Sequence, residues 1–260
     1  MQRIAQVRKG DGLITVTTTN YKLQPQIESM PIHKKSYNNI LHELQQKKVT
    51  LVAVSKTKTV AEIMELYELG HRDFGENYVQ ELTEKHFILP KDIRWHFIGH
   101  LQSKKVKYIS SFVHLIHGVD SLKLLLEIDK QGLKHKRVID CLLQVHIAQE
   151  ETKFGLSEAE LDELFAALPG YEAVDGLTNV NIKGLMGMAS FTDDLNKIKL
   201  EFKYLNALFD KYSSMHTKRV KMQTLSMGMS ADYKIAIEEG SNLVRIGSLL
   251  FGERTPKSLL

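Results

Sequence analysis

Eight short apolar runs, separated by amphipathic stretches, recur along most of the sequence and restrict the folds open to it. The runs cover residues 51–55, 72–75, 94–99, 112–119, 138–147, 182–188, 222–227 and 243–247. Apolar residues at helical spacing predict helices over 34–47, 61–69, 121–133, 157–168, 194–212 and 231–239. Eight strand–helix units in roughly 220 residues predict a parallel (β/α)₈ barrel. An open doubly wound sheet is the alternative, although no G-x-G-x-x-G motif follows the first run.

The composition is that of an ordinary globular protein. Apolar residues make up 43% and charged residues 25% of the 260 residues, which is enough for one large core. A net charge of +4 is too small to indicate a dedicated nucleic-acid-binding face. No run approaches the ~18 apolar residues of a membrane span, and no signal-peptide h-region begins the chain. We therefore expect a cytoplasmic protein without membrane association, in which the single cysteine, Cys141, is a core thiol.

Residues 1–30 differ from the rest of the chain. They contain the polar run 15–20 and Pro25, and they show no clear apolar periodicity. We expect a poorly ordered extension there and one barrel domain over residues 31–260. An ordered arm, or a translated leader upstream of Met30, remains an open alternative.

Lys56 directly follows the first apolar run, which ends at Ser55. Four consecutive apolar residues, 51–54, predict a strand that is buried on both faces. Ligand sites form at the carboxyl ends of parallel strands. A low-dielectric floor there would favour the uncharged lysine amine, which is the nucleophile that forms imines. Because a solvated lysine is the alternative, the assignment depends on the other strand ends.

The loops after the last two runs suit a phosphate group. Residues 226–230 read SMGMS, and the eighth run ends at Gly247, which Ser248 follows. Barrels commonly bind phosphate with backbone N–H groups of the loops after strands seven and eight. Gly247 allows close backbone approach, and we expect Ser230 to cap the helix that follows it. A pair of ordinary capped helices is the alternative.

Arg245 completes the candidate site. Strand side chains alternate, so Arg245 points into the barrel if Val244 and Ile246 face the helices. A buried arginine must be paired or must face a ligand, because an unpaired buried charge is costly. An imine-forming lysine, a phosphate site and an inward cation together suit pyridoxal 5′-phosphate (PLP), with its ring nitrogen near Arg245. An arginine there would keep that nitrogen unprotonated, which argues against aminotransferase-like chemistry.

Four segments resemble the YggS/PROSC family of pyridoxal phosphate homeostasis proteins. They are VAVSKTK (52–58), FGENYVQE (74–81), WHFIGHLQSKK (95–105) and LSMGMSADYKIAIEEGSNLVRIGSLLFGER (225–254). The resemblance covers about residues 34–254 and implies a barrel of the alanine racemase N-terminal type, with Lys56 as the Schiff-base lysine. It also implies a set of cofactor-binding positions: Asn77 near the ring, Arg245 at its nitrogen, and Ser226, Met229, Ser230, Gly247 and Ser248 at the phosphate. Lys153 matches a lysine linked to cofactor exchange in some relatives.

The resemblance also implies a function. It predicts a protein that binds, stores or delivers PLP and has no established turnover. We also expect a monomer, with PLP-dependent apoenzymes as candidate recipients. Racemases of this fold add a C-terminal β domain that supplies a second base, and the six residues after Arg254 cannot form one. A small PLP-dependent racemase or lyase that uses Lys56 as its only base is the alternative.

Two other kinds of site are not expected. Four histidines, at 96, 100, 114 and 117, come without a Cys or carboxylate cluster in the sequence, so we expect no metal. The basic segments 104–107 and 134–137 read as solvated helix surfaces, so we expect no specific binding of nucleic acid.

Overall fold

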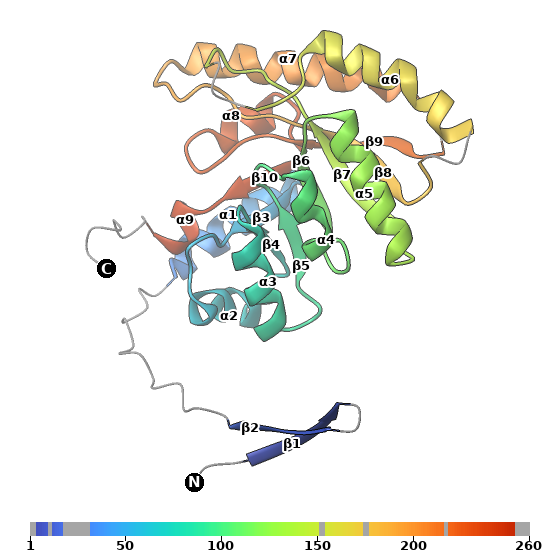
Figure 1. Cartoon of the computed structure of the whole chain (residues 1–260). Helices are drawn as coiled ribbons and strands as arrows, with labels where there is room; N and C mark the ends of the chain where they lie inside the picture. The colour runs from blue at the N-terminus through green and yellow to red at the C-terminus, as the bar shows by residue number, and fades with distance from the viewer. Residues whose placement is uncertain are drawn as a thin grey trace.

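Eight parallel strands form a closed barrel in the computed structural model, which describes residues 4–9, 12–17, 32–150, 154–173, 177–215 and 218–252 (Figure 1). The strands are β3 (Thr50–Val54), β4 (Asp73–Glu76), β5 (Arg94–Phe97), β6 (Leu115–Val119), β7 (Ile139–Gln144), β8 (Val180–Met186), β9 (Val220–Ser226) and β10 (Leu243–Ile246). They pair in chain order, and β10 closes the barrel by pairing Arg245 with Val52. The prediction of a (β/α)₈ barrel is confirmed.

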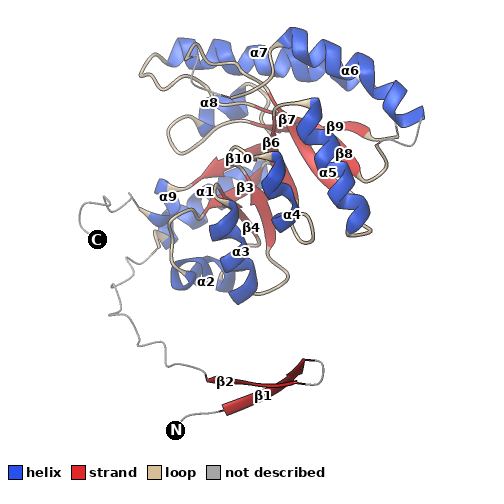
Figure 2. Cartoon of the chain, in the orientation of Figure 1, coloured by secondary structure: helices blue, strands red, loops and turns tan. Residues whose placement is uncertain are grey.

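Helices surround the strands (Figure 2). They are α1 (Lys34–Gln46), α2 (Val60–Glu68), α3 (Val79–Ile88), α4 (Val106–Ile109), α5 (Leu122–Lys134), α6 (Glu158–Ala173), α7 (Leu195–Ser213), α8 (Tyr233–Glu238) and α9 (Ser248–Phe251). All six helices predicted from periodicity are present. The sequence analysis missed α3, because its apolar residues do not share one face: Leu82 is buried, whereas Phe87 is 84% exposed. It also missed α4 and α9, which are too short to show a period.

Alternation along the strands divides the apolar residues into two cores. The larger lies between strands and helices and includes Val244 and Ile246. The smaller fills the barrel interior and consists of Val52, Leu115, Leu142, Met186 and Leu243. Arg245 belongs to the inward-facing set, so the predicted direction of its side chain is confirmed.

Near the N-terminus, β1 (Ile4–Lys9) and β2 (Gly12–Thr17) pair as a two-stranded antiparallel sheet that is separate from the barrel sheet. The sequence analysis did not expect these strands. Residues 1–3, 10–11 and 18–31 lie outside the described part of the chain, so the poorly ordered extension and the domain boundary at residue 30 remain predictions.

Two smaller expectations can be compared with the structure. No helix within the described residues is long and apolar enough to cross a bilayer. Cys141 is buried, and burial raises the pKa of its thiol, as expected of a core cysteine.

Candidate functional site

A cavity of about 690 Å³ opens at the carboxyl ends of the barrel strands. Seven predicted cofactor-binding residues line it: Lys56, Asn77, Met229, Ser230, Arg245, Gly247 and Ser248. The eighth, Ser226, lies beneath the cavity and bonds to Arg245. Lys153 lies outside the described residues. The structure therefore brings together residues that are up to 192 positions apart between Lys56 and Ser248, while their role as cofactor ligands remains a prediction.

The end of β3 fixes the position of Lys56. Ser55, its neighbour, is fully buried and donates its hydroxyl to Glu76 Oε1 at 2.6 Å. Thr57 has a left-handed φ of 65° and donates its backbone N–H to Glu81 Oε1 at 2.6 Å. The chain on both sides of Lys56 is thus anchored to β4 and α3, and Lys56 itself is only partly exposed.

Lys85 of α3 bonds to the same groups that fix the residues on either side of Lys56. Its Nζ donates to Ser55 O, Glu76 Oε1 and Glu81 Oε1, each at 2.7 Å. Burial raises the pKa of Glu76, although Lys85 and Ser55 act in the opposite direction. Sequence analysis missed this support because it missed α3; the i,i+4 spacing of Glu81 and Lys85 is the signal that could have indicated it.

A second lysine, Lys58, also lines the cavity but is engaged elsewhere. Its Nζ donates to Phe251 O at 2.8 Å and forms an ion pair with Glu62 at 3.2 Å. These contacts tie the Lys58 amine to α9 and α2. Lys58 is therefore a poor nucleophile in this arrangement.

Arg245 is a buried cation whose hydrogen-bond partners are neutral. Only 4% of the residue is exposed, and its NH1 donates to Ser226 O at 2.9 Å and to Ser226 Oγ at 2.5 Å. Its NH2 donates to Gly187 O at 3.0 Å. Burial lowers the pKa of Arg245 to about 10, so the guanidinium stays charged at neutral pH. An inward cation without a hydrogen-bonded carboxylate among the described residues suits an electron-rich or anionic ligand.

The loops after β9 and β10 meet at Ser230, whose Oγ accepts from the Gly247 N–H at 3.2 Å. The prediction that Ser230 caps α8 is wrong: Asp232 precedes that helix, and its carboxylate accepts from Met229 N–H at 2.6 Å. Ser248 and Leu249 are the first two residues of α9, so their backbone N–H groups have no acceptor within that helix. Outside the helices, no backbone carbonyl of the described residues accepts from the N–H groups of Ala231, Ser248 or Leu249. Donors of this kind at two adjoining loops are suited to phosphate oxygens.

Asn77 adds an unsatisfied acceptor to the cavity. Its Oδ1 is buried and has no hydrogen-bond partner within the described parts of the chain. A buried polar atom left in this way calls for a donor from a ligand or water.

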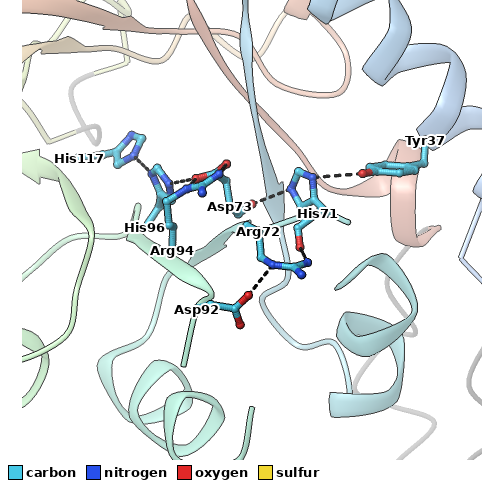
Figure 3. A network of polar contacts seen from close by, with 8 residues as sticks. All are labelled: Tyr37, His71, Arg72, Asp73, Asp92, Arg94, His96 and His117. Atoms are coloured by element: carbon cyan, nitrogen blue, oxygen red, sulfur yellow. Dashed lines mark hydrogen bonds and ion pairs between the residues drawn. The ribbon is translucent and has the colours of Figure 1, made fainter. Parts of the chain in front are cut away.

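The opposite end of the barrel interior carries a cluster the sequence analysis did not expect. Asp73, His96 and His114 bring one ligand atom each within 4.8 Å of one another, so a carboxylate does accompany the histidines. Arg94, however, donates to both Asp73 oxygens, at 2.7 and 2.5 Å (Figure 3). A metal here would lie against a guanidinium that already neutralises the carboxylate. We therefore still expect that this cluster binds no metal.

Comparison with known proteins gives consistent results. The family model "Alanine racemase, N-terminal domain" matches residues 34–255. A "Pyridoxal phosphate homeostasis protein" from Aquifex aeolicus (strain VF5) is 42% identical over 205 residues, which are 78% of this chain and 86% of that protein. PipY of Synechococcus elongatus PCC7942, solved without PLP, has a TM-score of 0.75 and 32% identity over 84% of this chain and 99% of its own. PipY with PLP bound has a TM-score of 0.71 and 33% identity over 82% of this chain and 99% of its own.

Proposed function

This chain belongs to the alanine racemase N-terminal domain family and, within it, to the pyridoxal phosphate homeostasis proteins, and on that premise we propose that it binds PLP for storage or delivery. The observation that carries the proposal is the cavity that Lys56, Arg245 and the loops after β9 and β10 share. The PLP-bound structure of PipY supports the choice of ligand, because that relative covers most of this chain.

The residues present fit the chemical parts of PLP. Lys56 offers an amine to the aldehyde, and the N–H groups of the two loops offer donors to the phosphate. Arg245 would offer a guanidinium to the ring nitrogen, and the amide of Asn77, which lies at the cavity wall, would be near the ring. Ser226 supports Arg245 from below, and Met229 and Ser230 belong to the phosphate-binding loop.

Bound PLP supplies an electrophilic aldehyde and an electron-withdrawing ring. Arg245 acts on the second property. A guanidinium only donates hydrogen bonds, so it keeps the ring nitrogen unprotonated and weakens electron withdrawal. That arrangement argues against aminotransferase-like chemistry, which depends on strong electron withdrawal by the ring, and is compatible with a cofactor held as a Schiff base on Lys56.

Delivery requires that the cofactor leave for a recipient, and PLP-dependent apoenzymes are the class we propose. Apolar side chains of Phe191 and Met229 are exposed at the cavity itself, which gives a recipient something to contact. We further propose that the protein acts as a monomer in the cytoplasm and that Lys153 assists exchange.

Two assays test the function. PLP-loaded protein is mixed with an apo-aminotransferase while a PLP-trapping enzyme removes free cofactor, and the recovery of aminotransferase activity is followed. We expect recovery from the wild type and none from Lys56→Ala protein carried through the same loading.

The second assay incubates the loaded protein with D- and L-amino acids in D₂O and follows exchange of the α-proton by NMR. We expect no sustained exchange. Robust exchange that disappears in Lys56→Ala would contradict the storage proposal and support a racemase or lyase.

A further inference from the structure

A chain of hydrogen bonds crosses the barrel interior from Arg245 to the far end. Ser226 Oγ, which accepts from Arg245, lies 3.2 Å from His117 Nδ1. His117 Nε2 lies 3.0 Å from His96 Nδ1, and His96 Nε2 lies 3.1 Å from Asp73 Oδ1 (Figure 3). All five groups are buried. The chain spans the interior because β6, which carries His117, and β9, which carries Ser226, are not neighbours in the barrel.

Hydrogen-bonding capacity fixes the bonds at both ends of this chain. A guanidinium has no acceptor, so Arg245 must donate to Ser226 Oγ. A carboxylate only accepts, so His96 must donate through Nε2–H to Asp73. With both rings neutral, each ring has one donor and one acceptor, so His96 Nδ1 accepts from His117 Nε2–H and His117 Nδ1 accepts from the Ser226 hydroxyl. Both histidines are then Nε2–H tautomers.

This direction links the buried cation to a distant anion. Every hydrogen in the chain points toward Asp73, and every lone pair that accepts points toward Arg245. The aligned dipoles favour positive charge at one end and negative charge at the other, and hydrogen bonds in such a chain polarise one another. Burial lowers the pKa of His117 well below its usual range, which keeps the ring neutral as the pattern requires.

We propose that His117 and His96 are positioning residues for the cofactor: they orient the Ser226 hydroxyl, which fixes the Arg245 guanidinium against the ring nitrogen. This inference rests on the proposed function and extends it beyond the residues that line the cavity. Neither histidine lines the cavity, so each acts only through Ser226.

The neighbouring histidine does not belong to the chain. The ring centroid of His114 lies 5.3 Å from that of His96, yet its side chain takes no part in the Asp73-to-Arg245 series of bonds. His114 is also exposed. It is therefore a matched control of the same residue type, close to the chain but outside it.

The first test reads the tautomers directly in cofactor-free protein. Long-range ¹H–¹⁵N correlation spectra distinguish protonated from unprotonated ring nitrogens, and His117→Phe, His96→Phe and His114→Phe assign the signals. We expect His117 and His96 to be neutral Nε2–H tautomers. An Nδ1–H tautomer at either position would overturn the chain.

The second test titrates PLP into wild type, His117→Phe, Ser226→Ala and His114→Phe, with circular dichroism as a check of folding. We expect His117→Phe and Ser226→Ala to weaken PLP binding about tenfold and to shift the visible band of the bound cofactor, and His114→Phe to do neither. Unchanged affinity and band in both chain variants would overturn the proposal.

Ser226→Ala is the smaller change and keeps the test decisive if His117→Phe does not fold. Because the tautomers are measured without cofactor, a failure of the chain is distinguishable from a failure of the wild type to bind PLP, which would overturn the proposed function instead.

Discussion

Each end of the barrel interior holds an arginine, and the two arginines have different kinds of hydrogen-bond partner. At the end where the strands begin, called the closed end below, Arg94 donates to both oxygens of Asp73. At the end where the strands finish, called the open end below, Arg245 lies beside the cavity and donates to the neutral oxygens of Ser226 and Gly187. Arg94 is also the more accessible of the two, with 47% of its side chain exposed. Arg94 is thus hydrogen-bonded to a carboxylate, whereas Arg245 has only neutral hydrogen-bond partners among the described residues and lies beside a cavity, with the Asp232 carboxylate acting on it through space.

The carboxylate at the closed end illustrates the same difference. Burial alone would raise the pKa of Asp73, but hydrogen bonds from Arg94 and His96 hold it well below its usual range. At the open end no carboxylate among the described residues is hydrogen-bonded to Arg245, and burial lowers its pKa to about 10, although the Asp232 carboxylate acts in the opposite direction. A ligand atom that accepts a hydrogen bond from Arg245 would offset part of the cost of burying that charge.

The largest effect is expected at the open end from the lysine. Lys56→Ala removes the only amine we assign to the aldehyde, so PLP affinity should fall by at least ~100-fold in equilibrium dialysis. Lys58→Ala is the control, because Lys58 is held by Phe251 and Glu62 and should change affinity by no more than a few fold. Equal losses of PLP affinity in Lys56→Ala and Lys58→Ala would contradict the assignment of Lys56 as the lysine that binds the aldehyde.

Exchanging the two arginines for glutamine tests the comparison itself. Arg245→Gln should weaken PLP binding about 10- to 100-fold, since a charged donor is lost, with little change in urea-unfolding free energy. Arg94→Gln should lower that free energy by about 1 kcal/mol, because its ion pair is half exposed, and should leave PLP affinity nearly unchanged. A loss of PLP affinity in Arg94→Gln, with a loss of stability alone in Arg245→Gln, would contradict the distinction between the two ends.

Two glycines with similar φ angles, Gly228 and Gly70, test whether the loop after β9 takes part in PLP binding. Gly228, in the loop after β9, has φ +94°, and a Cβ there would lie 2.6 Å from Ala236 Cβ. Gly228→Ala should cost about 2–3 kcal/mol from strain and overpacking and should lower PLP affinity several fold. Gly70 has φ +92° but open space around it, so Gly70→Ala should cost only about 1 kcal/mol without affecting PLP. Equal affinity in the two variants would contradict a binding role for the β9 loop.

The smallest expected effect is a pH dependence from the closed end. The folded-state pKa of Asp73 is depressed, so its contribution to stability is present above the unfolded pKa of about 3.9 and is lost as pH falls further. Chemical unfolding across the acid range should therefore show a shallower loss of stability in Asp73→Asn than in the wild type. Identical slopes would mean that Asp73 is not held by Arg94 and His96 in solution.

Periodicity explains what the sequence could predict. The eight strands, six helices and the inward direction of Arg245 follow from patterns of two and 3.6 residues, which the chain displays locally. The rule that parallel strands share a carboxyl edge is enough to predict that Lys56, Ser230 and Gly247 lie at the same end of the barrel.

What the sequence could not predict depends on register. Asp73 meets Arg94 because those two residues are paired across β4 and β5, and Gly75 is paired with His96 on the same ladder. One residue of slip would send each side chain to the other face. The His117–Ser226 bond also depends on barrel closure, since it joins strands that are far apart in the sheet. Ser230 was misassigned as a cap because its hydroxyl instead joins two loops that meet only in the folded barrel.

The most direct measurement is the site of covalent attachment. Protein mixed with PLP is reduced with borohydride, digested and mapped by peptide mass spectrometry, with Lys58 as an internal comparison in the same cavity. We expect a yellow protein whose phosphopyridoxyl mass, after reduction, falls on Lys56. A protein that takes up no PLP, or one that carries the label on Lys58, would contradict it.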